Sequence, residues 1–198
     1  MFATDDDSLE EDDSLFTARL CLTPPRAADA EALAALANNR NVAANLSSMP
    51  YPYARADALE WIGRVATATG PARAFLVRLG DPNGTVIGGA AVGPEPTAGD
   101  TEIGYWIGEP HWGAGYATEA AQAILDLAFS RHRVDEVWAA CRMTNEASRR
   151  VLVKCGFQWS GTGLRRSRAL GGMVSIERYR LDRKAWASLR AWGHGRGR

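Results

Sequence analysis

Trp112-Gly113-Ala114-Gly115-Tyr116-Ala117-Thr118-Glu119-Ala120 is a glycine turn that joins a strand-like run, residues 101–107, to an alanine-rich helical run. Such a turn leaves backbone N–H groups unpaired at the start of a helix, where the helix dipole also favours negative charge. Gly113 and Gly115 have no side chains that would keep a phosphate group away from these amides. The stretch therefore predicts a strand, a phosphate-binding turn and a helix.

Two common glycine fingerprints do not describe this turn. A P-loop requires a lysine after the glycines, and a dinucleotide-binding loop requires a small residue at Thr118. The spacing Trp112-x-x-Gly115-x-Ala117 instead resembles the pyrophosphate loop of the GNAT superfamily of acetyl-CoA-dependent N-acetyltransferases. The leading tryptophan is similar to that of one branch, which contains the ribosomal-protein N-terminal alanine/serine acetyltransferases.

Two further segments carry the same resemblance. Residues 145–157, Asn-Glu-Ala-Ser-Arg-Arg-Val-Leu-Val-Lys-Cys-Gly-Phe, are similar to the Asn-x-x-Ser-x-x-Val-x-x-Lys-x-Gly-Phe segment of that branch. Residues 50–61 begin Pro-Tyr-Pro-Tyr and are similar to a segment that walls the acceptor side in those enzymes. Together the resemblance extends from residue 16 to residue 187.

The resemblance implies acetyl-CoA as the acyl donor and a primary amine as the acceptor. The acceptor would be a protein N-terminus or a small amine such as an amino sugar, a polyamine, an amino acid or an antibiotic, and family membership does not choose among them. The donor-binding residues that the resemblance implies are Ile107, Trp112, Gly113, Ala114, Gly115, Tyr116, Ala117, Thr118, Asn145 and Ser148. A non-catalytic acyl-CoA-binding or regulatory module is the alternative from another class.

Acetyl transfer requires a neutral amine, a stabilised oxyanion and a proton for the departing thiolate. The tyrosine acid of many superfamily members corresponds to Leu152 here, so the resemblance assigns proton donation or thiol binding to Ser148. A surface serine is the alternative. Glu102, in the strand before the glycine turn, is the first candidate base, and Glu177 is the second. For both glutamates, a surface or ion-paired structural role is the alternative.

Backbone and aromatic groups complete the expected site. A backbone N–H near Ile107 or Gly108 would stabilise the oxyanion, at the point where the strand of such enzymes diverges from its neighbour. Tyr51, Tyr53 and Trp61 would either line the acceptor pocket or pack against helices.

Charge is distributed unevenly along the 198 residues. Seven of the 23 acidic residues lie among the first 13 residues, and all 23 Lys and Arg lie after them. We expect an acidic disordered tail over residues 1–14, one N-acetyltransferase domain over 15–190, and a flexible basic tail over 191–198. The basic body suits a polyphosphorylated donor and an acidic partner, whereas no motif indicates nucleic-acid binding.

Cysteine and histidine spacing indicates neither disulfides nor a metal. Cys21, Cys141 and Cys155 are odd in number and contain no Cys-x-x-Cys pair, and the three histidines lack metal-ligand spacing. No run resembles a signal peptide or a membrane span, so we expect a cytoplasmic protein without a membrane partner, with a homodimer as one option.

Hydrophobic periodicity predicts the order of the elements. We expect a strand at 19–23, a helix at 27–39, a loop-rich stretch at 41–54, a helix through residues 61–65 and a hairpin turning at 81–84. Strands at 101–107, 136–141, from 157 and at 174–181 would alternate with two helices, the second capped by Thr144 and Gly156. This order predicts an α/β (α+β) fold, a single mixed, largely antiparallel sheet flanked by helices on both faces.

Overall fold

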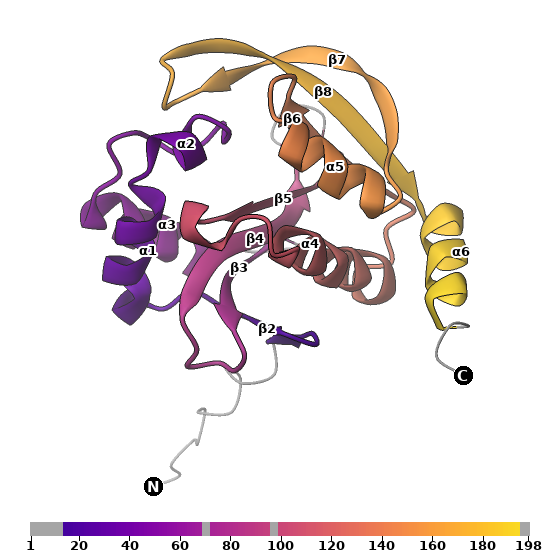
Figure 1. The fold of residues 1–198 in the computed structure, drawn as a ribbon, viewed down its shortest axis with the longest axis horizontal. Helices are drawn as coiled ribbons and strands as arrows, with labels where there is room; N and C mark the ends of the chain where they lie inside the picture. Colours follow the sequence, from indigo (N-terminus) through magenta and orange to yellow (C-terminus); the bar gives the residue numbers. More distant parts are fainter. Residues whose placement is uncertain (1–13, 69–71, 96–98, 195–198) are drawn as a thin grey trace, which may run out of the picture.

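The computed structural model describes residues 14–68, 72–95 and 99–194, which build one eight-stranded sheet flanked by helices (Figure 1). The strands, in chain order, are β1 (Leu15–Phe16), β2 (Leu20–Thr23), β3 (Arg73–Leu79), β4 (Val86–Pro94), β5 (Thr101–Ile107), β6 (Glu136–Arg142), β7 (Gln158–Ser167) and β8 (Gly172–Asp182). The helices are α1 (Ala30–Ala37), α2 (Arg40–Ala43), α3 (Arg55–Ala66), α4 (Tyr116–Asp126), α5 (Glu146–Lys154) and α6 (Arg183–His194). Two 3-10 turns, η1 (Ala27–Asp29) and η2 (Glu109–His111), and a π-helical turn, η3 (Leu127–Arg131), complete the set.

The sheet is mixed and mainly antiparallel, as predicted. Its strand order is β1-β2-β3-β4-β5-β6-β8-β7, and β5 with β6 is the parallel pair among the described strands. Within the described chain these two strands are in register only at Glu102 and Trp138. Because the pairing stops there, β5 and β6 diverge toward their C-terminal ends and open a gap in the middle of the sheet.

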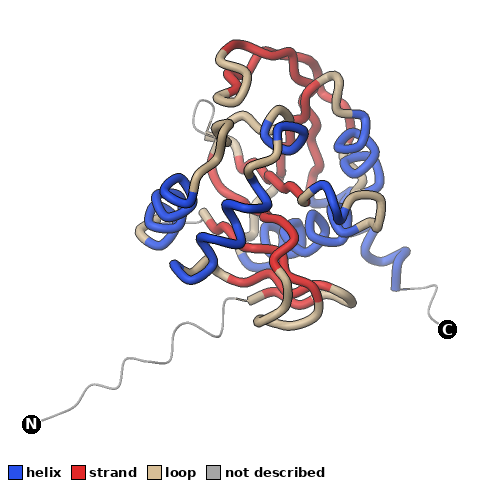
Figure 2. The backbone as a smooth tube through the Cα atoms, turned by 60° about the vertical axis from the view of Figure 1, so that its left-hand side comes forward, coloured by secondary structure: helices blue, strands red, loops and turns tan. Residues whose placement is uncertain are grey.

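Helices cover both faces of this sheet (Figure 2). On one face α4 and α5 bury their apolar sides in the larger core, which includes Ile124, Phe129 and Leu152. On the other face α1 and α3 close a smaller core around Leu33 and Leu76. Burying a Leu, Ile or Phe side chain stabilises the fold by about 1.5–3 kcal/mol. The two cores therefore hold the gap between β5 and β6 in a rigid frame.

Local capping differs from the prediction at one end of α5. Asn145, not Thr144, is the N-cap, and its side chain accepts a hydrogen bond from the Ser148 N–H at 3.1 Å. Gly156 follows the helix with φ of 89° as predicted, and the Phe157 N–H donates to the Leu152 carbonyl at 3.0 Å. These bonds satisfy groups that the helix leaves unpaired at both ends.

Two helices were not predicted. The short helix α2 lies within the stretch that was expected to be loop-rich, and α6 follows β8 directly. Helix α6 ends at His194, so it includes half of the segment expected to be a flexible basic tail. Residues 195–198 and all of the expected acidic tail except Ser14 lie outside the described residues. None of the helices in the described part of the chain has the length and hydropathy to span a membrane.

Candidate active site

The predicted phosphate-binding turn begins helix α4. Gly113 and Gly115 have φ angles of 80° and 83°, a left-handed conformation that residues with a side chain adopt at a cost. The Gly115 carbonyl accepts from the Thr118 and Glu119 N–H groups at 3.1 and 3.2 Å. The earlier amides of the turn and of α4 are the ones that a helix start leaves open for an anion.

Trp112 ties this turn to the end of β5. Its indole N–H donates to the Ile107 carbonyl at 2.6 Å, while the Gly108 N–H donates to Ile87 of β4 at 2.8 Å. Hydrogen bonds alternate along an antiparallel pair, so the N–H and C=O groups of Ile107 point away from β4 and into the gap beside β6. Of the two predicted oxyanion donors, Ile107 is therefore the available one, because Gly108 already has an acceptor.

Arg19, which the sequence did not single out, binds the outside of the glycine turn. It donates to the Ala114 carbonyl at 2.9 Å, and its guanidinium lies 4.7 Å from the centre of the Tyr116 ring. Glu119 holds it in place, with Arg19 Nε to Glu119 Oε2 at 2.7 Å and Thr17 Oγ1 to Glu119 Oε1 at 2.6 Å. Burial acts to raise the pKa of Glu119, but the hydrogen bonds from Thr17 and Arg19 outweigh it and lower that pKa.

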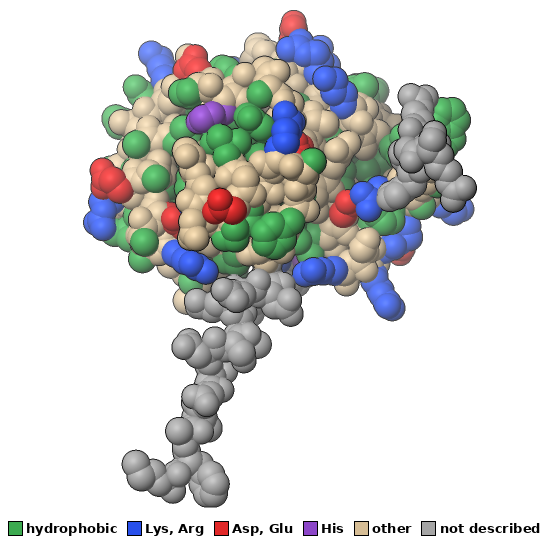
Figure 3. All heavy atoms as spheres, turned by 60° about the horizontal axis from the view of Figure 1, so that its bottom comes forward, with side chains coloured by type: hydrophobic (Ala, Val, Ile, Leu, Met, Phe, Trp, Pro, Cys, Tyr) green, Lys and Arg blue, Asp and Glu red, His purple; other side chains and the backbone are tan. Residues whose placement is uncertain are grey.

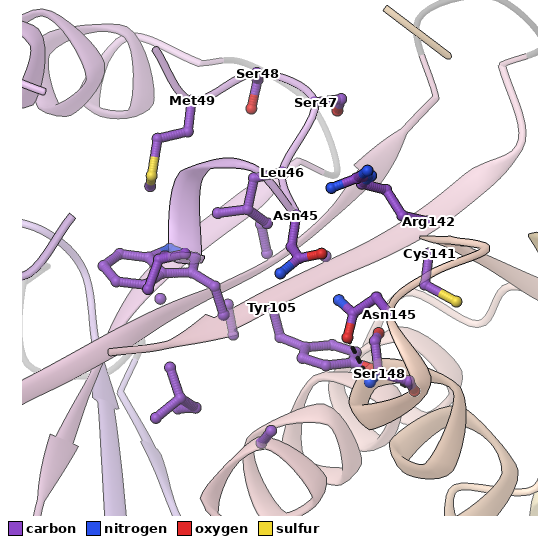
Figure 4. Close-up of a pocket in the computed structure, with 18 of the residues that line it drawn as sticks. Asn45, Leu46, Ser47, Ser48, Met49, Tyr105, Cys141, Arg142, Asn145 and Ser148 are labelled. Carbon is purple, nitrogen blue, oxygen red and sulfur yellow. Dashed lines mark hydrogen bonds between the residues drawn. The ribbon is translucent and has the colours of Figure 1, made fainter. Parts of the chain in front are cut away.

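Two hydroxyl groups meet at the gap between β5 and β6. The Tyr105 and Ser148 hydroxyls lie 3.0 Å apart, and Figure 4 shows the two side chains pointing toward each other from β5 and α5. Burial raises the pKa of Tyr105, although the hydrogen bond with Ser148 opposes the shift, so the phenol stays protonated at neutral pH. Leu152, at the position of the superfamily's tyrosine, is buried in the core. The sequence contained Tyr105 but gave no register that would place it beside Ser148.

Cys141 lies next to this hydroxyl pair in the cavity wall. Burial and the nearby Glu177 carboxylate raise the pKa of its thiol to about 11, against the lowering effects of Arg149 and Ser148. The thiol is therefore protonated at neutral pH and is a poor nucleophile.

Both predicted bases are paired with arginines. Glu102 lines the cavity, but Arg165 binds both of its oxygens at 2.6 and 2.8 Å. Glu177 lies outside the cavity walls, and its oxygens accept from Arg149 at 2.9 and 3.1 Å and from Tyr179 at 2.9 Å. Both carboxylates thus take part in charge-assisted hydrogen bonds with arginines. The ion-paired alternative describes both glutamates better.

The cavity around these groups has a volume of about 840 Å³. One end is formed by the glycine turn, Thr118 and two basic residues of α5, Arg150 and Lys154. The opposite end is formed by residues 44–50, with Tyr53, Trp61, Arg142 and Arg168. Tyr51, by contrast, is exposed and is not part of the wall. Among residues 14–68, 72–95 and 99–194, no group of three or more His, Cys, Asp or Glu side chains is placed to hold a metal ion.

Fold and sequence comparison together define the family. Residues 19–158 match the acetyltransferase (GNAT) domain, so the chain belongs to the GNAT acetyltransferase family. An N-acetyltransferase of Bacillus licheniformis, p20, is 30% identical over 89 residues, which make up 45% of this chain and 50% of that protein. The ribosomal-protein-serine acetyltransferase of Escherichia coli is 33% identical over 67 residues, 34% of this chain and 37% of that protein. The matched segments thus span half of these curated relatives or less.

Solved structures agree on the fold over a longer stretch. RimJ of Mycobacterium smegmatis, in complex with CoA-disulfide, superposes with a TM-score of 0.73 at 22% identity and covers 88% of this chain and 89% of its own. At this identity the likeness establishes the GNAT fold and leaves the acceptor open.

Proposed function

We propose that this protein is an acetyl-CoA-dependent N-acetyltransferase that transfers acetyl to a primary amine by direct attack on the thioester. The observation that carries the proposal is the gap between β5 and β6, which has the glycine turn at one end and the Tyr105–Ser148 hydroxyl pair beside it. Family membership supports the same conclusion. A cytoplasmic location and a homodimer stay predictions from the sequence.

Two parts of the donor, the pyrophosphate and the pantetheine arm, have suitable groups in the cavity. The amides of the glycine turn suit a pyrophosphate, and Arg150 and Lys154 add positive charge at that end of the cavity. The inward-facing N–H and C=O groups of β5 can pair with the amides of a pantetheine arm as an added strand would. Asn145 and Ser148 lie further along the same cavity.

The chemistry follows from the positions of three groups. As the amine nitrogen forms a bond to the thioester carbon and the carbon–sulfur bond breaks, the Ile107 N–H would stabilise the negative charge on the thioester oxygen. Ser148, with Tyr105 bound to its hydroxyl, would donate a proton to the departing sulfur. The proton lost by the amine would leave to water in the cavity, because both candidate carboxylates are held by arginines.

The first experiment measures release of free CoA from acetyl-CoA with a thiol reagent, across peptides that begin with Ala or Ser and a panel of small amines. Turnover with one class identifies the enzyme and its acceptor class together. Gly115→Glu should abolish acetyl-CoA binding by adding bulk and negative charge to the turn. Gly63→Glu is the matched control, because a side chain at Gly63 on α3 meets nothing within 4 Å. Unchanged affinity in Gly115→Glu would contradict the proposal.

A non-catalytic acyl-CoA-binding module is the second candidate. The engaged state of Glu102 and Glu177 favours it, since no free carboxylate base remains at the predicted positions. Binding of acetyl-CoA in a calorimetric titration without turnover of any acceptor would support this module over the enzyme.

A further inference from the structure

We propose that the acceptor carries a carboxylate a few bonds from its amine, and that Arg142 recognises this anionic group. The inference rests on the proposed function and narrows it to a chemical class of acceptor. Four observations carry it: the position of Arg142, the lack of an acidic partner, the state of the carboxylates around it and a second arginine at the mouth of the cavity.

Arg142 stands beside the reacting end of the cavity. It is the last residue of β6 and follows Cys141 directly, and its carbonyl accepts the N–H of Asn145, the N-cap of the helix that carries Ser148, at 2.8 Å. Its half-buried side chain lines the acceptor end, and Figure 4 shows it extending toward the segment with Asn45 and Ser47. An anion bound to Arg142 would therefore place an attached amine close to the Tyr105–Ser148 pair.

The Arg142 guanidinium has a neutral partner. Its Nη1 donates to the Ala44 carbonyl at 2.9 Å, and among the described residues no carboxylate forms an ion pair with it. A guanidinium offers five N–H groups in a planar fork that matches a carboxylate or a phosphate. A partly buried charge with a single neutral acceptor is stabilised further when an anion arrives.

The carboxylates in the same walls are already engaged. Glu102 is bound by Arg165 at 2.6 Å, Asp57 accepts the Ala54 N–H at 2.8 Å, and Glu60 lies 3.9 Å from Arg64 on the exposed side of α3. None of these groups offsets the charge of Arg142 at short range. With Glu60 beside Arg64 and Glu102 beside Arg165, the charges left at this end are those of Arg142, Arg168 and Asp57. This small positive excess disfavours a basic peptide.

Arg168 extends this positive region to the mouth of the cavity. Arg168 follows β7 and is exposed. Its guanidinium Nη1 donates to the Ser48 carbonyl at 3.3 Å, and its backbone N–H donates to the Ser47 carbonyl at 3.0 Å. Arg142 and Arg168 thus approach the segment of residues 44–48 from two different strands. This arrangement would attract an anionic amine before it reaches Arg142.

Two sources share the required chemistry. In a free amino acid the anion is the molecule's own carboxylate, and in a peptide it is an acidic side chain next to the N-terminal residue. We would measure kcat/KM for two matched pairs, alanine against alaninamide and the amidated peptides Ala-Glu-Ala-Ala against Ala-Gln-Ala-Ala. Each pair changes the anionic group, and rates are expressed per neutral amine because the carboxylate of alanine raises the pKa of its amine relative to that of alaninamide. The pair that shows a preference identifies the source.

We expect the anionic member of one pair to be preferred by about tenfold to a hundredfold, the range of a charged hydrogen bond. Arg142→Gln should remove this preference, measured as the ratio of kcat/KM between the two members of a pair, and leave the affinity for acetyl-CoA unchanged. Arg142→Lys keeps a positive charge and should retain part of the preference. Arg131→Gln, on an exposed arginine of η3 outside the cavity, is the control and should behave as the wild-type protein.

The outcomes separate this inference from the proposed function. Equal turnover of both members of each pair, or a preference that persists in folded Arg142→Gln protein, would overturn the role of Arg142 and leave the acetyltransferase intact. Absence of acetyl transfer to every acceptor would reject the proposed function and the inference with it. Thermal denaturation of each variant shows that it is folded before rates are compared.

Discussion

Tyr105 places a hydroxyl beside Ser148 from a strand, whereas the superfamily commonly carries a tyrosine on the helix before its Gly-Phe pair. That helix position is occupied here by Leu152, whose side chain belongs to the core, while the Tyr105 hydroxyl reaches Ser148 at 3.0 Å. The sequence alone could not predict that Tyr105 lies beside Ser148, because the distance between β5 and α5 is set by tertiary packing.

We expect Tyr105→Phe to lower kcat by about tenfold to a hundredfold, as loss of a group that assists proton transfer does. The KM for acetyl-CoA should stay nearly constant, because burial keeps the rest of the ring in place. Steady-state kinetics with Tyr51→Phe, an exposed tyrosine outside the cavity, provide the comparison. If Ser148→Ala lowers kcat by the same factor and the double variant is no slower than either single one, the two hydroxyls act as a unit.

Glu102→Gln tests whether the first predicted base takes part in the chemistry. Because Arg165 occupies both oxygens, we expect kcat to fall by less than about tenfold and its dependence on pH to keep its shape. The pH profiles of kcat for the wild-type and variant proteins decide the matter. Loss of the acid limb in the variant would restore Glu102 as the base.

At the scale of elements, the start of α4 is held by a hairpin far away in the sequence. Arg19, between β1 and β2, binds the Ala114 carbonyl, and Glu119 fixes Arg19. The turn was predictable from its glycines. The Arg19–Glu119 interaction was not, because it joins residues about 100 positions apart and no local sequence pattern indicates it. It rigidifies the amides that would hold the pyrophosphate, and so links the fold of the first hairpin to donor binding.

Glu119→Gln should destabilise the protein in a manner that depends on pH. The pKa of this carboxyl is lowered in the folded state, so its contribution is present above its unfolded pKa and is lost as pH falls through the folded value. The difference in Tm between wild-type and variant proteins should be largest near neutrality and should shrink below pH of about 4. Melting curves from pH 3 to 7 measure it, with Glu146→Gln on the exposed side of α5 as the control. A constant difference would contradict the role of the charge.

At the scale of the whole molecule, the elements that could be predicted were those with a local periodic pattern. Strands β2 to β8, the β3–β4 hairpin, α4 and the Gly156 cap of α5 follow from side-chain period and glycine placement, whereas the two-residue strand β1 is too short to show a period. The ion pairs could not be predicted from the sequence. Whether Glu102 contacts Arg165 depends on a strand register that residue types do not determine. The charge of the acceptor end depends on the same long-range pairings.

Surface charge gives a similar lesson. The basic excess of the chain after its first 13 residues predicted an anionic ligand without locating it. On the face in Figure 3, Lys and Arg side chains are dispersed among acidic and neutral ones and form no continuous patch. A dispersed pattern on that face is unlike the basic stripe that nucleic acid requires. The structure instead places Arg142 in the wall of the cavity and Arg168 at its mouth.

Helix α6 was missed although Ala185, Trp186 and Leu189 follow helical spacing, and it anchors the C-terminal end of the fold (Figure 1). The Trp186 ring stacks on Phe129 with 5.1 Å between centroids, and its indole N–H donates to Asp126 at 3.1 Å. Removing a large aromatic side chain from such a contact costs about 2–4 kcal/mol, so Trp186→Ala should lower Tm by about 4–16 °C.

Because α6 lies outside the cavity, the KM for acetyl-CoA should stay unchanged in folded Trp186→Ala protein. Trp159→Ala removes an exposed tryptophan from β7 and should shift stability by less than about 0.5 kcal/mol. Equal melting temperatures for Trp186→Ala and wild-type protein would mean that α6 contributes little to stability. A raised KM with unchanged Tm would instead mean that α6 takes part in donor binding. Neither the stacking of Trp186 on Phe129 nor its hydrogen bond to Asp126 links α6 to the cavity.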